Sequence, residues 1–472
     1  MNYKIKKVFK NISYSISSNL ISMIVSFVVI LIVPKLLGVE EYGYWQLYLF
    51  YLSYVGFLHF GWNDGIYLKY GGEKYEDLNK NLFFSQFWML VIFQVLVGII
   101  ILGASKVFIT DSSKQYIVEM ISISTILVNV RYMLIYILQG TNRIKEFAQI
   151  TILDRVFYCL LIILFLFLGI RDFKLLIIAD IIGKLISLCY AIYCCRNLIF
   201  NKISKFYLSL KETIENINIG IKLMFANIAS ILIIGIMRFG IERTWDVATF
   251  GKVSLILSIS NLMMIFINAI GIIMFPILRR VNVNTLPIIF KAIRTFLLLI
   301  LLGLLLLYYP LKFGFSIWLP QYRDSLIYLA LVFPMCIYEG KMAMLINTYL
   351  KTMRKEKLML AINLVSVLLS IILSIISTII FKNISLAMGS IVVLLAFRCI
   401  LAEVILSKEL KVSVLKDNIY EVTMTIVFII TSWLIASWIG VLIYLITYLL
   451  YMWIKRNDIK LALEDLMEIM KN

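Results

Sequence analysis

Apolar residues along the chain gather into long blocks that short polar or basic segments separate. Each block is about 20 residues long, which is the length of helix that crosses the ~30 Å hydrocarbon core of a bilayer. A soluble protein has no reason to repeat that length. Fourteen membrane spans are therefore predicted, at 13–33, 43–61, 82–104, 116–138, 147–169, 173–195, 217–237, 250–278, 289–309, 325–348, 358–380, 384–405, 419–436 and 438–455.

Composition supports this pattern. Hydrophobic residues make up 62% of the 472 residues, charged residues make up 15%, and the mean hydropathy is +0.96. Soluble domains are nearer half apolar and a quarter charged. We therefore predict an all-α polytopic membrane protein.

The net charge of +18 follows from topology and does not indicate nucleic-acid binding. Cytoplasmic loops of membrane proteins collect Lys and Arg. With both termini inside, the inside segments hold 29 Lys and Arg residues and the outside segments hold 10. This bias predicts a multi-pass membrane protein with cytoplasmic termini, in contact with the lipid bilayer and without a nucleic-acid partner.

A short pattern occurs twice. Asn19 lies 24 residues before Gly43 in EYGYW, and Asn227 lies 24 residues before Gly251 in TFGKV, with a shift of 208 residues between the copies. The second copy begins after six spans, so both copies start on the same side of the membrane. Parallel repeats of this kind build the two halves of some transporters, with the substrate bound between them.

The repeat predicts two pseudo-symmetric six-helix lobes followed by a C-terminal helix pair. The expected boundaries are an N-lobe at 1–195, a cytoplasmic linker at 196–216, a C-lobe at 217–405, and the last two spans with a cytoplasmic tail at 406–472. The lobes would rock against each other to give alternating access.

The chain lacks motifs of catalysis or metal binding. Its six cysteines match no metal-ligand spacing, and no GxSxG or Walker pattern occurs. We expect no catalytic residues, no metal and no cofactor, and a transporter rather than an enzyme.

Charged residues inside the predicted spans are the candidate functional residues. Each costs about 2.5–3.5 kcal/mol at the centre of a lipid-facing helix, so these side chains must face protein or water. Internal ion pairing is one interpretation, and Asp180 with Lys184, four residues apart, fits it best. Arg398 and Glu403, five apart, match only loosely. The alternative is a water-filled cationic cavity that binds an anionic substrate through Arg131, Arg155, Lys184, Lys341 and Arg398, with ion coupling through Asp154, Asp180 or Glu339.

Uncharged polar residues are candidates for the same cavity. Asn19, Ser22 and Ser26 lie on one face of the first span, and a similar stripe in the eighth span includes Asn261. Such small residues also serve helix–helix contact. His59, the only histidine, and Asp64 lie at the inner end of the second span, and the cavity is predicted to contain both.

Two adjacent stretches resemble a known family. VPKLLGVEEYGYWQLYLFYLSYVGF (33–57) and GWNDGIYLKYGG (61–72) resemble the opening of polysaccharide repeat-unit flippases of the Wzx type. These flippases belong to the multidrug/oligosaccharidyl-lipid/polysaccharide (MOP) exporter superfamily. The resemblance is close over about the first 75 residues. The remainder of the chain resembles the family more loosely, in its number of spans and in the second copy of the repeat.

The resemblance implies a flippase of the bacterial inner membrane. It would move an undecaprenyl-diphosphate-linked oligosaccharide repeat unit of an O-antigen, capsule or exopolysaccharide from the cytoplasmic to the outer leaflet. The resemblance also implies a glycan polymerase and a chain-length regulator as partners. An ion-coupled multidrug exporter of the same fold is the first alternative, but cations outnumber carboxylates within the spans. An integral-membrane glycan polymerase is the second, although the predicted outer loops are short.

Overall fold

The structure is a computed structural model that describes residues 3–280 and 285–471. Its described residues form helices and turns, with no strand. A bilayer offers no hydrogen-bond partner to the backbone, and a helix satisfies its own N–H and C=O groups. The helices group into two compact units, Met1–Ile228 and Ala229–Asn472. The predicted all-α membrane fold is confirmed.

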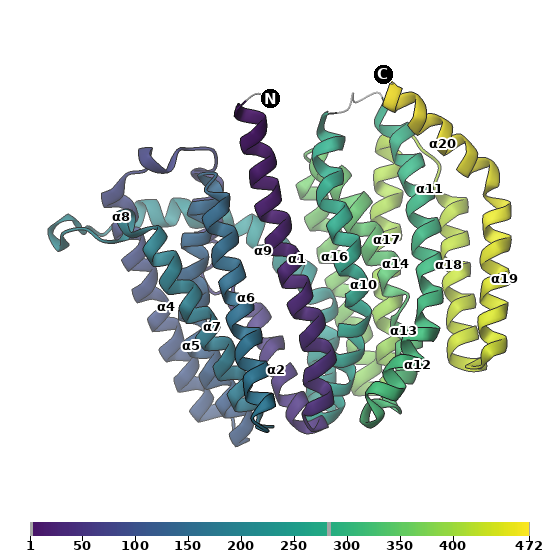
Figure 1. Ribbon diagram of the computed structural model, residues 1–472, viewed down its shortest axis with the longest axis horizontal. Helices are drawn as coiled ribbons and strands as arrows, with labels where there is room; N and C mark the ends of the chain where they lie inside the picture. The colour runs from purple at the N-terminus through teal and green to yellow at the C-terminus, as the bar shows by residue number, and fades with distance from the viewer. Residues whose placement is uncertain (1–2, 281–284, 472) are drawn as a thin grey trace. The chain divides into compact units, whose positions relative to one another are not determined.

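Unit 1 contains eight described helices and the start of a ninth. The elements are α1 (Tyr3–Leu36), α2 (Val39–Val55), α3 (Trp62–Lys69), α4 (Lys80–Phe108), α5 (Ser112–Gly140), α6 (Ile144–Phe167), α7 (Phe173–Cys194), α8 (Arg196–Ile199) and α9 (Leu210–Thr244), which continues into unit 2. The long helices α4, α5, α6 and α7 run beside one another (Figure 1). Their shared core includes the fully buried Leu90, Met133, Leu134, Ile150 and Ala191.

Unit 2 contains the remaining helices. They are α10 (Val247–Arg280), α11 (Leu286–Leu304), α12 (Tyr308–Trp318), α13 (Leu329–Val332), α14 (Met335–Lys341), α15 (Asn347–Thr352), α16 (Glu356–Ser374), α17 (Ile384–Leu410), α18 (Leu415–Ile429), α19 (Trp438–Ile454) and α20 (Arg456–Lys471). Aromatic rings of Tyr308, Phe333, Phe428 and Tyr444 contact one another and join α12, α18 and α19.

Twelve helices of the described residues are long and apolar enough to cross a membrane, and a thirteenth is counted if the bent pair α19–α20 is one span. The predicted second span, 43–61, differs from the structure. Helix α2 begins at Val39 and ends at Val55, and turns lead to α3. The break is physical, because Phe60 and Gly61 have φ values of 52° and 86°, which a helix does not tolerate.

Glycines in the GWNDG segment bring α3 against α9. A Cβ atom on Gly65 would overlap the backbone of Asn216, and one on Gly61 would lie 2.6 Å from the backbone N of Ile221. The neighbouring side chains also bind distant helices. Asn63 donates to the Asn129 carbonyl at 2.9 Å. The segment is therefore a packing element that fixes α3 between α5 and α9.

The expected lobe boundaries fall differently from the compact units. The linker predicted at 196–216 contains α8 and the first turns of α9, and α9 then continues as one helix through the predicted span at 217–237. The two units divide within α9, between Ile228 and Ala229.

The C-terminal apolar stretch forms two helices. A π-helical segment at Ile430–Ile435 ends α18, and Ala436 turns with a φ of 45°. Ser437 then caps α19 by accepting from the Ile439 N–H at 3.2 Å. Helix α20 bends away from α19 by 54° (Figure 1).

Candidate functional site

Arg131 and Asp154 form a buried ion pair in unit 1. Nη1 of Arg131, on α5, lies 2.8 Å from Oδ2 of Asp154, on α6. The same nitrogen donates to Oγ of Ser187, on α7, at 3.1 Å. Nε of Arg131 is buried and has no hydrogen-bond acceptor among the described residues. Three helices thus position one guanidinium that retains a free donor.

Asp180 and Lys184 form a second buried ion pair in unit 1, as their spacing of four on α7 predicts. The hydroxyl of Tyr48, on α2, donates to Asp180 Oδ2 at 2.6 Å and contacts Ser124 Oγ at 3.1 Å. The carboxylate therefore has both a charged and a neutral donor, which is what a buried anion requires.

Arg155 differs from the other predicted cations. It lies on α6 beside Asp154 in the sequence, and its side chain is exposed on unit 1. Within the described residues it forms no ion pair. Successive residues on a helix point about 100° apart, so Arg155 does not point in the direction in which Asp154 meets Arg131.

Lys341 is the centre of a buried network in unit 2. Its Nζ lies 2.9 Å from Oε2 of Glu403, on α17, and also contacts Glu421, on α18. All three side chains are completely buried. Lys341 is the last residue of α14 and precedes a π-helical segment at Met342–Ile346. Such segments recur at functional sites.

Arg294, on α11, extends this network. Its Nε lies 2.5 Å from Oε1 of Glu403, and it also pairs with Asp417. Asp417 in turn pairs with Lys455. Arg294 lies inside the predicted span 289–309 and Glu421 inside the predicted span 419–436, but neither was among the candidate residues. A carboxylate inside the predicted span 419–436 was the signal that could have found the network.

Arg398 belongs to a separate cluster. Its Nη1 lies 3.1 Å from Oε1 of Glu339, and its Nε donates to Oδ1 of Asn363 at 3.1 Å. The loose match of Arg398 with Glu403 is wrong. Positions five apart on a helix point about 140° apart, so each side chain meets a different neighbouring helix.

The uncharged candidates occupy varied environments. Asn19 and Asn261 are exposed. The hydroxyls of Ser22 and Ser26 each donate at 2.9 Å to a carbonyl of their own helix, Ser18 and Ser22 respectively.

His59 and Asp64 are buried in unit 1, with Nε2 of His59 3.7 Å from Oδ2 of Asp64. Nδ1 of His59 accepts from the Gly61 N–H at 3.0 Å. The imidazole therefore stabilises the turn between α2 and α3.

Ion pairing alters the charge available for substrate. Four of the five predicted cations, Arg131, Lys184, Lys341 and Arg398, contact carboxylates, and the three carboxylates predicted for ion coupling are among these partners. Arg155 is the fifth predicted cation, and it contacts no carboxylate within the described residues. Whether these residues bind substrate stays a prediction, and the pairs show that any anion must compete with a carboxylate for the bound cations.

Comparison with known proteins gives the family and the fold. A family model described as polysaccharide biosynthesis protein matches residues 8–282, more than half of the chain. Comparison with curated proteins gives no match.

Solved structures with a similar fold are transporters. One is an inward-facing multidrug resistance MATE family transporter of the MOP superfamily, with 11% identity and a TM-score of 0.62 over 83% of this chain and 99% of that chain. Another is a MOP superfamily transporter from Pyrococcus furiosus, described as having a binding pocket of reverse polarity. It shares 12% identity, with a TM-score of 0.54 over 85% of this chain and 96% of that chain. The chain is a multi-pass membrane protein that belongs to the polysaccharide biosynthesis protein family, and it has the fold of MOP superfamily transporters.

Proposed function

We propose that the chain is a flippase that moves an undecaprenyl-diphosphate-linked oligosaccharide repeat unit from the cytoplasmic to the outer leaflet of the bacterial inner membrane by alternating access. Both termini would lie in the cytoplasm. The family match supports a role in polysaccharide biosynthesis, and the fold supports transport. The flippase activity, the undecaprenyl-diphosphate-linked substrate, the bacterial inner membrane and the cytoplasmic termini are the proposed parts.

The charges of unit 1 carry the proposal. The candidate residues of unit 1 are three cations, Arg131, Arg155 and Lys184, and two carboxylates, Asp154 and Asp180. Arg131 and Lys184 pair with the two carboxylates, so the net positive charge of this set is on Arg155. An unpaired arginine exposed to lipid would be costly, so Arg155 requires water or an anion. A diphosphate that enters a bilayer loses hydration, and the forked N–H donors of arginine can replace it.

Unit 2 contributes less net charge. Each of Lys341, Arg398 and Arg294 has a carboxylate partner. A phosphate can bind these cations only if a carboxylate moves or takes up a proton. Ion coupling through Asp154, Asp180 or Glu339 would act in this way, because a proton or metal cation that neutralises the carboxylate releases its arginine or lysine for substrate.

An ion-coupled multidrug exporter is the second candidate, favoured by the MATE-like fold. It would place an exposed carboxylate where a cationic drug binds. Among the charged candidate residues within the spans of unit 1, the exposed one is instead the cation Arg155.

Purified protein reconstituted in vesicles with an undecaprenyl-diphosphate-linked oligosaccharide tests the proposal. Translocation is measured as the fraction of glycan that a membrane-impermeant probe can reach. We expect the wild-type chain to accelerate this exposure over protein-free vesicles and Arg155→Gln to reduce the rate at least about tenfold, the effect expected from loss of about 1.4 kcal/mol of binding to the moving phosphate.

Arg171→Gln is the matched control, because Arg171 is exposed beyond the end of α6. It should translocate at the wild-type rate. Movement of a cationic dye with no movement of the lipid-linked glycan would reject the flippase and select the exporter.

A further inference from the structure

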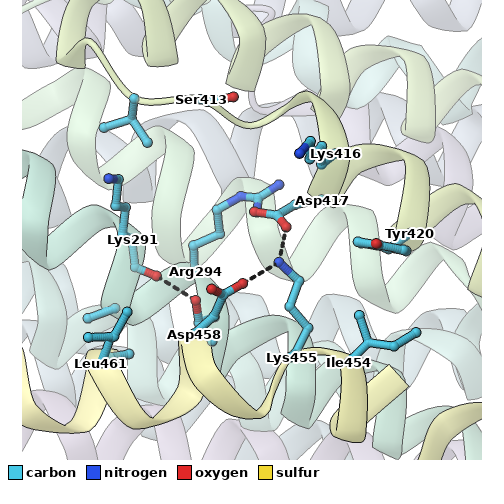
Figure 2. A pocket seen from close by; sticks show the side chains of 14 residues that line it. Lys291, Arg294, Ser413, Lys416, Asp417, Tyr420, Ile454, Lys455, Asp458 and Leu461 are labelled. Carbon is cyan, nitrogen blue, oxygen red and sulfur yellow. Dashed lines mark hydrogen bonds and ion pairs between the residues drawn. The ribbon is translucent and has the colours of Figure 1, made fainter. Parts of the chain in front are cut away.

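A basic pocket lies in unit 2, away from the buried ion pair of Arg398. Residues of α11, α18, α20, the end of α19 and the α17–α18 connection enclose about 660 Å³. Figure 2 shows the Arg294 guanidinium beside Asp417, with Lys455 between Asp417 and Asp458. The pocket therefore has a floor of paired charges.

Two further lysines line this pocket without a carboxylate partner. Lys291 and Lys416 are both exposed, and neither forms an ion pair within the described residues. Counting Arg294 and Lys455, the pocket contains four cations and only two carboxylates, Asp417 and Asp458. Because Arg294 also pairs with Glu403, the positive charge of the lining that has no paired carboxylate within the described residues is on the exposed Lys291 and Lys416.

Apolar side chains border the same opening. Ile454 and Leu461 line the pocket and are 44% and 57% exposed. On α18, which contributes Lys416 and Tyr420 to the lining, the non-lining residues Leu415 and Ile419 are 66% and 65% exposed. A basic cluster next to exposed apolar residues is typical of a surface that contacts anionic lipid at the membrane interface. Lysine and arginine are also the usual ligands of phosphate groups.

We propose that this pocket binds a phosphate-bearing anion, and that its apolar border selects the headgroup of an anionic phospholipid over a soluble phosphate. Lys291 and Lys416 would contact the phosphate directly. Arg294 and Lys455 would supply the positive floor, held in place by Asp417. A phospholipid at this site would join α11, α18 and α20. The proposal does not depend on which substrate the protein transports.

The experiment uses the full chain purified in detergent micelles. Its apparent Tm is measured with added phosphatidylglycerol, with phosphatidylcholine, and separately with inorganic pyrophosphate. We expect phosphatidylglycerol to raise Tm more than phosphatidylcholine does. The double variant Lys291→Gln/Lys416→Gln should lose at least half of that difference.

A matched double variant controls for net charge. Lys351 and Lys408 are exposed lysines outside the pocket, so Lys351→Gln/Lys408→Gln removes the same charge and should keep the wild-type difference. Comparing lipids within each variant removes any change in baseline Tm. Native mass spectrometry of the same samples gives the number of phosphatidylglycerol molecules retained, which should fall by one in the pocket variant.

Three results would overturn the proposal. A pyrophosphate shift equal to that of phosphatidylglycerol, and lost in the pocket variant, would overturn the selection of lipid. Equal losses in both double variants would show diffuse attraction between charges and no pocket. A wild-type chain that phosphatidylglycerol and phosphatidylcholine stabilise equally would reject an anion site altogether.

Discussion

Nζ of Lys341 lies 2.9 Å from Oε2 of Glu403, and neither side chain has any exposed surface. The two residues are 62 positions apart, on α14 and α17. Removing water from both charges is costly, and only the close contact and the further partners Arg294 and Glu421 offset that cost. The network is therefore balanced, and removal of any one charge leaves an opposite charge buried without compensation.

Lys341→Met should destabilise the protein, because Glu403 and Glu421 would remain buried near each other without their shared cation. Breaking a buried pair typically costs about 3–5 kcal/mol. Folded abundance in membranes and the apparent Tm in detergent measure the loss. Lys351→Met, at an exposed position, should leave both unchanged. Full abundance of Lys341→Met would show that the carboxylates are neutral or hydrated.

Arg131→Met should reduce folded abundance for a similar reason, since Asp154 loses the cation 2.8 Å away. The double variant Arg131→Met/Asp154→Leu removes both charges and should recover most of that abundance, because an apolar pair of similar volume can replace a buried ion pair. Quantitative immunoblotting of membranes measures the three proteins. A double variant no better than the single one would mean that Arg131 stabilises the fold through Ser187.

Tyr48→Phe should destabilise unit 1 by about 1.5–3 kcal/mol, the usual contribution of a hydrogen bond to a charged group. The lost bond is the 2.6 Å contact from the Tyr48 hydroxyl to Asp180. Tyr193→Phe is the control, because Tyr193 is 61% exposed. Thermal unfolding in detergent, followed separately for each variant, should show a lower Tm for Tyr48→Phe alone. Equal Tm values for the two variants would remove Tyr48 from the Asp180 site.

Gly65→Ala should disturb the packing of α3 on α9, because the added methyl group would overlap the Asn216 backbone. We expect a loss of at least about 2 kcal/mol, as for other overpacked sites. Gly103→Ala is matched, since Gly103 lies in α4 with open space around its Cα. It should be neutral or slightly stabilising. The rate of proteolytic cleavage in the 56–75 segment measures the loss of packing. Equal cleavage rates for Gly65→Ala and Gly103→Ala would contradict the prediction.

Sequence by itself determined the fold class and the positions of nearly all spans. The apolar blocks are long, and a bilayer imposes one length on every helix that crosses it, so the pattern needs no tertiary information. The Asp180–Lys184 pair was also accessible, because a spacing of four on one helix fixes the contact locally. The sequence did not predict that the helix breaks after Val55, because the break depends on the contact of Gly61 and Gly65 with α9.

Tertiary structure alone decided the partners of the other buried charges. Arg131 meets Asp154, Arg398 meets Glu339, and Lys341 meets Glu403, each between two different helices. Composition gave an excess of in-span cations, but attraction between charges depends on distance, and distance between helices is set by packing. For that reason the sequence predicted the candidate charged residues, and the fold showed that Arg155 is the one of the five candidate cations that is exposed.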